Sequence, residues 1–295
     1  MPETRFGHIA LMGLPNAGKS TFLNTLIQEK VSIVSDKAQT TRGMNLGIYT
    51  KGHIQIGFLD LPGVHKPKHE MNRRMMKLVR QGLEDSDAVF HLVDATSKKH
   101  HGDGYISQMI REKELPYFLL ANKIDLINKQ KLIGHLAELQ ERFQPDHIVP
   151  ISAKEGDNLD HLVELVTPFL PEGVFRFELD DYTNQSVRSM VRELIRERVL
   201  FFTRDEIPHA STVELETFEL DPEEDRYYID AVIYVEKPGQ RKILIGKNGS
   251  MLKKIKNGLN NNLSKLLYKS VSCDLFIKVK TDWRNREAFL DQIEL

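Results

Sequence analysis

The chain has 295 residues, which predicts about two domains, each long enough for a hydrophobic core of its own. Hydrophobic residues make up 40% and charged residues 28%, and 41 basic residues nearly balance 42 acidic ones, so the net charge of the whole chain indicates no partner. The single cysteine, Cys273, excludes an intrachain disulfide and a zinc site built from several thiolates. The sequence has no run of about 18 apolar residues, so it predicts no membrane-spanning helix.

The first fifteen residues turn glycine-rich after one short apolar run, so they lack the long apolar core of a secretory signal. We therefore expect the protein in the cytosol, a reducing compartment in which unpaired thiols are usual. From Gly7 to about Leu170, short apolar runs alternate with amphipathic stretches. This alternation predicts an α/β fold with a mostly parallel sheet, helices on both faces, and ligand sites at the carboxyl ends of the strands.

A phosphate-binding pattern, G-x-x-x-x-G-K-[ST], follows the first apolar run and precedes an amphipathic one. Its glycines let backbone N–H groups converge on phosphates at a helix N-terminus, Lys19 reaches the β and γ phosphates, and the Ser20 hydroxyl ligates Mg²⁺. The predicted phosphate-binding residues are Gly13, Leu14, Pro15, Asn16, Ala17, Gly18, Lys19, Ser20 and Thr21.

A second motif, D-x-x-G, ends the apolar run IQIGFLD. Asp60 is expected to project from the end of a strand toward the same Mg²⁺, and Gly63 to offer its backbone N–H to a γ-phosphate. The tetrapeptide alone is weak evidence, and its position downstream of the phosphate-binding loop gives it weight.

Two further motifs predict which base the site accepts. Asn122-Lys123-Ile124-Asp125 follows the run PYFLLA, and the N1–H and exocyclic amine of guanine form a donor pair that the Asp125 carboxylate can accept. Adenine has no such pair, so the motif favours GTP over ATP. The triplet Ser152-Ala153-Lys154 follows the run HIVPI, and its Ala153 N–H is expected to close over the guanine oxygen. The predicted base-binding residues are Asn122, Lys123, Asp125, Ser152, Ala153 and Lys154.

Between the phosphate-binding loop and Asp60 lies Gln39-Thr40-Thr41-Arg42, and with this segment the chain resembles the translation-factor-related GTPases in all five of their motifs. The resemblance implies a threonine that contacts Mg²⁺ only when GTP is bound. We predict Thr41, by its place before the arginine, with Thr40 as the alternative. The predicted metal ligands are Ser20, Thr41 and Asp60.

No catalytic residue is assigned from the sequence. Ras-like proteins have a water-orienting glutamine directly after the D-x-x-G glycine, and this chain has Val64 there. We therefore expect slow unassisted hydrolysis, with water held by backbone groups, by an ion or by a partner. Asn16 resembles the asparagine that related GTPases use to hold potassium in place of an arginine finger, so K⁺ is a hypothesis for a second ion.

The alternating pattern ends near Pro168, Pro171 and Gly173, which indicates a domain boundary. We predict one domain at 1–170, a linker at 171–185 and a second domain at 186–295 with the order α, β, β, α, α, β. Residues 205–236 carry eleven acidic side chains and one basic, whereas residues 237–280 carry eleven basic and one acidic. A basic block of this kind is typical of a surface that binds a nucleic-acid backbone.

Within the basic block, a G-x-x-G lies between two helical segments. With the element order, it resembles a KH domain of the second type, an α+β fold whose glycines let a single-stranded RNA backbone approach closely. Ile243, Ile245 and Leu252 either wall the RNA groove or pack in the core. The predicted RNA-binding residues are Ile245, Gly246, Lys247, Asn248, Gly249, Lys253, Lys254 and Lys256.

A P-loop GTPase domain followed by one type II KH domain is similar, over nearly the whole chain, to a bacterial family of translation-factor-related GTPases. The resemblance implies binding to 16S rRNA near its 3′ end, a role in assembly of the small ribosomal subunit, and peripheral contact with the inner membrane. We expect a monomer whose GTP or GDP state gates RNA binding. An RNA chaperone that uses the first domain only as a folded platform remains the alternative. An ATP-using kinase is disfavoured, because adenine would leave Asp125 unpaired.

Overall fold

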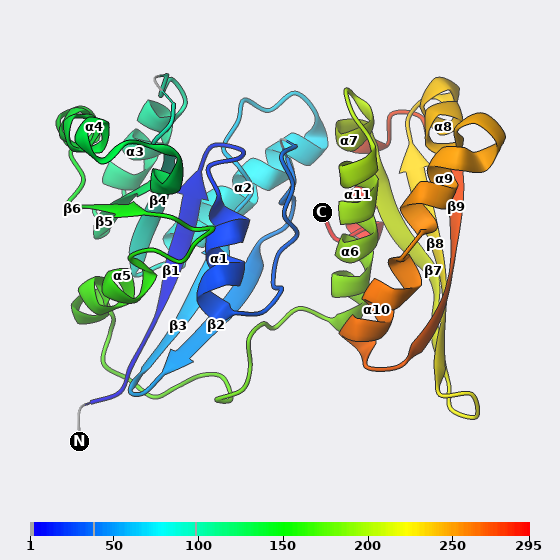
Figure 1. Ribbon diagram of the computed structural model, residues 1–295, viewed down its shortest axis with the longest axis horizontal. Coiled ribbons are helices and arrows are strands. Elements are labelled where there is room, and N and C mark those ends of the chain that lie inside the picture. The colour runs from blue at the N-terminus through cyan, green and yellow to red at the C-terminus, as the bar shows by residue number, and fades with distance from the viewer. Residues whose placement is uncertain (1–2, 38, 98) are drawn as a thin grey trace. The chain divides into compact units, whose positions relative to one another are not determined.

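A computed structural model of the chain describes residues 3–37, 39–97 and 99–295, and its contacts divide the chain into two compact units. The first unit extends through Pro67 and from Asn72 to Asn184, and the second contains Lys68–Met71 and Gln185–Leu295. Each unit has its own sheet and its own core (Figure 1). This architecture, a P-loop type α/β unit followed by an α+β unit with a small separate sheet, is the one expected from the sequence.

The first unit is built on a six-stranded sheet in the order β2-β3-β1-β4-β5-β6. All neighbouring pairs are parallel except β2 and β3, which are joined by a tight turn and pair antiparallel. Because parallel strands are covered on both faces, their sequences are almost continuously apolar. The strands are β1 (Arg5–Gly13), β2 (Asn45–Lys51), β3 (Ile54–Asp60), β4 (Ala88–Asp94), β5 (Tyr117–Asn122) and β6 (His147–Ile151).

Helices cover both faces of this sheet, with α1 in front of it and α2 behind it in Figure 1. Alternate residues of β1 point to opposite faces: Ile9 and Leu11 pack with α1 and α5, whereas Ala10 and Met12 pack with α2, α3 and α4. The helices are α1 (Lys19–Ile27), α2 (Glu70–Glu84), α3 (Asp103–Arg111), α4 (Lys129–Phe143) and α5 (Leu159–Val166), with 3₁₀ turns η1 (Ile124–Leu126) and η2 (Thr167–Phe169).

Residues 171–184, which we call the strap, lie against the first unit. The fully buried side chain of Gln55 on β3 accepts hydrogen bonds from the backbone N–H groups of Arg176 and Phe177 and donates to the Phe177 carbonyl. Farther along, the Ile48 N–H of β2 donates to the Tyr182 carbonyl (2.9 Å). The segment predicted to be a linker is therefore hydrogen-bonded to β3 and to the edge strand β2.

The second unit contains a three-stranded sheet in which β8 pairs antiparallel with β7 and parallel with β9. The predicted order α, β, β, α, α, β is present, with short additional helices. The elements are α6 (Val187–Phe202), α7 (Ile207–Ala210), β7 (Thr212–Asp221), β8 (Arg226–Val235), α8 (Pro238–Ile245), η3 (Lys247–Gly249), α9 (Ser250–Lys256), α10 (Leu259–Leu267), β9 (Ser270–Val279), η4 (Trp283–Asn285) and α11 (Glu287–Gln292).

The core of the second unit lies between its sheet and one layer of helices. Ile195 of α6, Ile255 of α9 and Leu263 of α10 belong to one buried cluster with Ala231 and Ile233 of β8. Within the described ranges, no helix is long and apolar enough to cross a membrane.

Candidate functional site

The phosphate-binding loop connects β1 to α1 and depends on glycine for its shape. Gly18 has φ +99°, a conformation that side chains rarely adopt, and a Cβ atom there would lie 2.2 Å from the Asn122 side-chain nitrogen. The Asn122 amide nitrogen also donates to the Ala17 carbonyl (2.7 Å). The loop that follows β1 is therefore packed directly against the end of β5.

Lys19, the lysine of this loop, is only 6% exposed. Its Nζ donates to the carbonyl oxygens of Gly13 (3.1 Å) and Leu14 (3.3 Å), so the ammonium group lies within the loop. Burial lowers the pKa of Lys19, and the nearby charge of Asp60 partly opposes this shift. A cation placed here is positioned to meet phosphate oxygens.

The three predicted metal ligands converge at the start of α1. Ser20 Oγ donates to Asp60 Oδ2 (2.9 Å), Thr41 Oγ1 donates to the same oxygen (3.3 Å), and the two hydroxyl oxygens are 3.1 Å apart. Thr40 is placed differently, because its hydroxyl donates to the Lys37 carbonyl (2.6 Å). Of the two threonines, Thr41 is the one that the structure brings to Ser20 and Asp60.

Asp60 itself is fully buried at the end of β3. Burial raises its pKa, whereas Lys19 and the hydroxyl groups of Ser20, Ser32 and Thr41 lower it. Its Oδ1 is buried and has no hydrogen-bond partner among the described residues. A carboxylate and two hydroxyl oxygens form a hard donor set that fits Mg²⁺, and the unpartnered oxygen is available to such an ion or its water.

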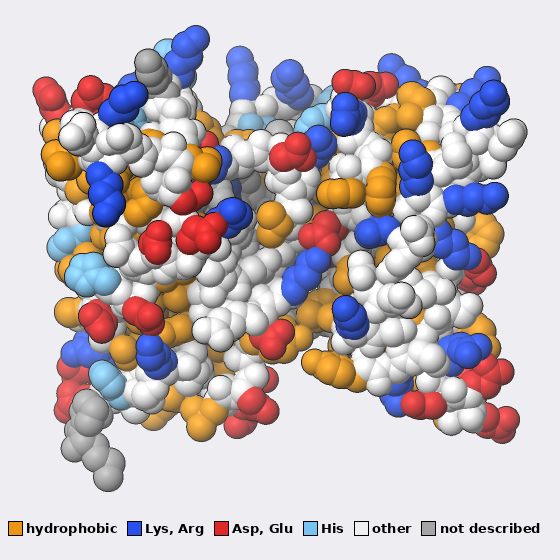
Figure 2. Space-filling model, in the orientation of Figure 1, with side chains coloured by type: hydrophobic (Ala, Val, Ile, Leu, Met, Phe, Trp, Pro, Cys, Tyr) orange, Lys and Arg blue, Asp and Glu red, His pale blue; other side chains and the backbone are white. Residues whose placement is uncertain are grey.

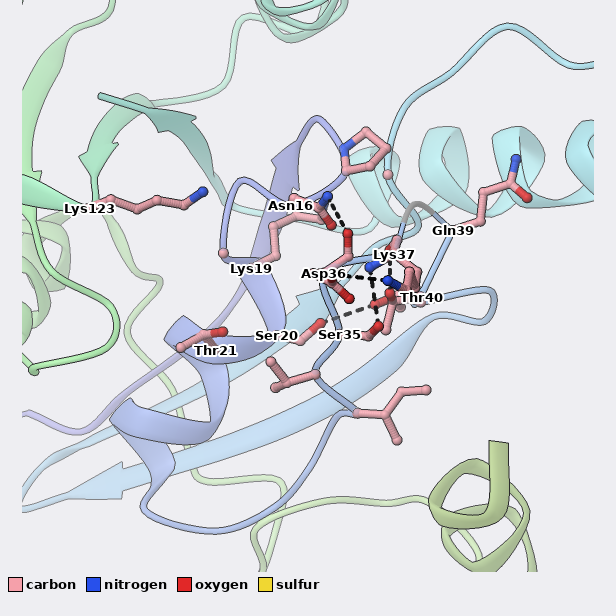
Figure 3. Close-up of a pocket in the computed structure, with 16 residues that line it drawn as sticks. Asn16, Lys19, Ser20, Thr21, Ser35, Asp36, Lys37, Gln39, Thr40 and Lys123 are labelled. Atoms are coloured by element: carbon pink, nitrogen blue, oxygen red, sulfur yellow. Dashed lines mark hydrogen bonds and ion pairs between the residues drawn. The ribbon is translucent and has the colours of Figure 1, made fainter. Parts of the chain in front are cut away.

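A cavity of about 410 Å³ opens beside this cluster (Figure 3). The phosphate-binding loop forms one wall, residues 33–37 and 39–41 form another, and Lys123 lies across from Asn16. The Asn16 amide nitrogen donates to the Asp36 carbonyl (2.7 Å), which joins the two walls. Residues 33–37 carry no motif, so the sequence did not identify them as part of the site.

The predicted base-recognition motifs on β5 and β6 are joined by side-chain hydrogen bonds. Asn122 Oδ1 accepts from the backbone N–H groups of Lys123 (2.8 Å) and Ala153 (2.9 Å). The Ala153 N–H, which we expected to face the guanine oxygen, is therefore bonded to Asn122 here. Asp125 Oδ1 accepts from the buried Ser152 hydroxyl (2.8 Å), which holds the carboxylate after β5.

Lys123 and Lys154 differ in their surroundings. Lys123 Nζ lies 2.5 Å from Asp94 Oδ2 at the end of β4, a partner that no sequence motif indicated. Burial acts to raise the pKa of Asp94, but hydrogen bonds from Lys123 and Thr96 lower it overall. Lys154 is largely exposed and pairs with its neighbour Glu155 (2.9 Å). The structure therefore fixes the first lysine more firmly than the second.

The loop after Asp60 passes close to the phosphate-binding loop. A Cβ atom on Gly63 would lie 3.1 Å from atoms of Pro15, so the two backbones approach closely. The next residue, Val64, is 4% exposed and packs with Leu61 and Val79 in the apolar core. Its side chain is directed away from solvent and cannot orient a water molecule.

The G-x-x-G of the second unit forms a tight turn between α8 and α9. Gly246 has φ +74°, and a Cβ there would lie 2.6 Å from the Met251 backbone nitrogen, so the position requires glycine. Gly249 also has a positive φ (+75°) but faces open space, and Asn248 lies between them with φ +52°. The turn leaves Lys247 exposed at its tip.

Lysines continue from this turn along α9, and Figure 2 shows basic side chains over α8 and α9. Lys253 and Lys254 are exposed, whereas Lys256 pairs with Asp274 of β9 (2.5 Å). Three apolar residues were expected either to wall the RNA groove or to pack in the core. Ile243 is 50% exposed, while Ile245 and Leu252 pack against the core. Ile243 is therefore the one available at the surface.

Family models match both units. A model described as 50S ribosome-binding GTPase matches residues 8–123, and a KH domain model matches residues 206–284. These ranges contain the phosphate-binding loop, Asp60 and Asn122 in the first unit, and the whole G-x-x-G turn in the second.

Two solved structures are similar to nearly the whole chain. The crystal structure of a single-residue variant of Aquifex aeolicus Era bound to GDP·AlF4⁻ is 33% identical, covers 98% of this chain and 99% of its own, and has a TM-score of 0.93. The crystal structure of Era in complex with MgGDPNP and nucleotides 1506–1542 of 16S ribosomal RNA is 34% identical, covers 98% of each chain, and has a TM-score of 0.94.

Proposed function

The chain belongs to the Era family of GTPases, and on that premise we propose that it hydrolyses GTP and that its nucleotide state gates binding of its KH domain to 16S rRNA near the 3′ end during small-subunit assembly. One observation carries the nucleotide part of the proposal. Ser20, Thr41 and Asp60 come from three separate segments and meet within hydrogen-bond distance beside the phosphate-binding loop.

In the proposed complex, GTP lies in the cavity with its phosphates on the loop from Gly13 to Thr21. Lys19 exchanges its two carbonyl partners for phosphate oxygens, and the backbone N–H groups at the start of α1 point at the same charges. Asp125, oriented by Ser152, accepts the paired N–H donors of guanine.

We propose Mg²⁺ as the cofactor, held by Ser20, Thr41 and Asp60. When bound, Mg²⁺ neutralises negative charge on the phosphate oxygens. Thr41 lies in the segment that lines the cavity, so a Mg²⁺ ion that contacts Thr41 only when GTP is bound would order that segment in the GTP state. The Era structure with MgGDPNP supports the choice of ion.

Hydrolysis without a partner is expected to be slow because Val64 is buried where related enzymes carry a water-orienting side chain. We propose that K⁺ bound near the Asn16 side chain contributes to turnover. Replacing K⁺ by Na⁺ at constant ionic strength should then slow hydrolysis. Equal rates in the two salts would remove potassium from the mechanism.

The RNA part of the proposal depends on the G-x-x-G turn and the lysines of α9. The turn lets a phosphate backbone approach without steric conflict, and the exposed side chains of Lys247, Lys253 and Lys254 can neutralise it. One matching family model is described by the 50S subunit, but the Era structure that matches the whole chain, KH domain included, contains 16S rRNA. We therefore propose the small subunit as the target.

Binding of an rRNA fragment with the sequence of nucleotides 1506–1542 tests the proposal. The affinity should be highest with a non-hydrolysable GTP analogue and lower with GDP or without nucleotide, and Gly246→Asp and Lys247→Asp should weaken binding in every state. Equal affinities in the three states would contradict nucleotide gating and favour the alternative, a nucleotide-independent RNA chaperone.

A further inference from the structure

The loop after Asp60 contains a histidine that none of the motifs uses. His65 follows the buried Val64 and is partly exposed. Its Nδ1 lies 2.7 Å from the Gly63 carbonyl oxygen, and its Nε2 lies 2.5 Å from the Asn72 side-chain nitrogen at the start of α2. Both ring nitrogens therefore have partners within the first unit.

These two contacts determine the tautomer of the ring. A carbonyl oxygen can only accept, so Nδ1 carries the hydrogen and donates it to Gly63. Nε2 is then an acceptor, and it receives an N–H from the Asn72 amide. Asn72 is 2% exposed, so burial sets its position, and its amide supports the ring.

The hydrogen bond to Gly63 fixes more than one carbonyl. A peptide unit is planar and trans, so holding the Gly63 oxygen also sets the direction of the Val64 N–H on the other side of the same plane. Gly63 also approaches Pro15 of the phosphate-binding loop. Gly63 thus contacts that loop, and the carbonyl that begins the Gly63–Val64 peptide is held by the His65 ring.

We propose that His65 is a positioning residue for GTP hydrolysis, which acts by fixing the Gly63–Val64 peptide beside the γ-phosphate position, with Asn72 holding the ring. The inference rests on the GTPase function proposed above. Backbone groups set in place before reaction can orient water or stabilise developing charge, and the apolar side chain of Val64 can do neither. His65 acts through Gly63 and need not touch the nucleotide.

Three variants at this position test the role. His65→Ala removes the donor and should lower kcat about 10- to 100-fold, while the affinity for a fluorescent non-hydrolysable GTP analogue changes by less than about threefold. In His65→Asn, the amide nitrogen is attached to Cγ as Nδ1 is, so it can donate to Gly63 and should restore most of kcat. His65→Gln places its nitrogen where Nε2 lies and should stay slow.

Single-turnover kinetics, analogue binding and thermal unfolding of the full chain should be measured for each variant. His161→Ala, an exposed histidine on α5, serves as the control and should behave as the unaltered protein. Asn72→Ala should lower kcat by a smaller factor than His65→Ala, because it frees the ring without removing the donor.

Unchanged kcat in His65→Ala would overturn the inference while leaving the GTPase proposal intact. So would a loss of analogue affinity as large as the loss of kcat, because the residue would then only shape the pocket. Equal kcat in the Asn and Gln variants would also overturn it. Absence of GTP turnover in the unaltered protein would overturn the proposed function itself.

Discussion

Asp125→Asn should change the base that the protein accepts, and the hydrogen bonds around Asp125 determine how. The Ser152 oxygen accepts from the Glu155 N–H (3.2 Å), so its own hydrogen is donated to Asp125 Oδ1 (2.8 Å). In the variant, the amide oxygen stays in the Oδ1 position because only an oxygen can accept from Ser152. The amide nitrogen then replaces Oδ2.

This orientation gives a magnitude. Guanine would lose one charge-assisted hydrogen bond, about 1.5–3 kcal/mol, and one of its N–H donors would face another donor, a further cost of about 1–3 kcal/mol. The sum, about 2.5–6 kcal/mol, corresponds to GDP binding weaker by about 10²- to 10⁴-fold. Xanthine has an oxygen where guanine has its exocyclic amine, so the amide nitrogen can donate to it, and XDP binding should become stronger.

Competition with a fluorescent guanine nucleotide measures both affinities. Asp160→Asn, a change of the same chemistry at an exposed carboxylate of α5, should leave both unchanged. If Asp125→Asn keeps GDP affinity within about threefold of the unaltered protein and gains none for XDP, Asp125 does not read the base.

Thr41→Ala should weaken Mg²⁺-dependent binding of a GTP analogue by about tenfold or more, while Thr40→Ala should not, because only Thr41 lies beside Ser20 and Asp60. Titration of magnesium against each variant measures the two losses of affinity, and equal losses would contradict the assignment of Thr41. Gly246→Ala should lower the free energy of unfolding by about 1–3 kcal/mol and weaken RNA binding, since its Cβ meets the Met251 backbone. Gly249→Ala, which faces open space, should cost only about 1 kcal/mol in urea unfolding, and a larger loss there than at Gly246 would refute the steric argument. Burial raises the pKa of Cys273 to about 12, so at pH 8 iodoacetamide should label the folded protein far more slowly than the urea-unfolded one. In the unfolded protein, labelling should become faster as the pH rises toward 9.0, the ordinary pKa of the thiol. Comparable labelling rates would show that the thiol is accessible and ionisable in the folded protein.

Much of the fold followed from the sequence because its signals are local. Apolar runs of strand length alternate with amphipathic segments in the first unit, and the motif residues follow those runs, so the parallel sheet and the gathering of motifs at one edge could be expected together. In the second unit, the break at Gly246 and Gly249 separates two helices by backbone conformation alone.

The contacts that could not be predicted depend on how the elements pack together, and no motif marks them. Asp94 meets Lys123 only because β4 and β5 are neighbours, and Asn72 meets His65 only because α2 folds back on the loop before it. The Ala153 N–H donates to the Asn122 side chain, a contact that depends on side-chain packing and not on the motif. The expected peripheral contact with the inner membrane, the monomeric state and the role of K⁺ stay predictions.

The strap gives the first unit a protected edge. β2 is the outermost strand of its sheet, and an outermost strand presents unpaired N–H and C=O groups that can add a strand from another molecule. The Tyr182 carbonyl and the Thr183 hydroxyl take up the Ile48 N–H and the Leu46 carbonyl, so part of that edge is already paired. A first unit cut at residue 170 would bare these groups and invite self-association, whereas one that ends at residue 184 would keep that part of its edge paired.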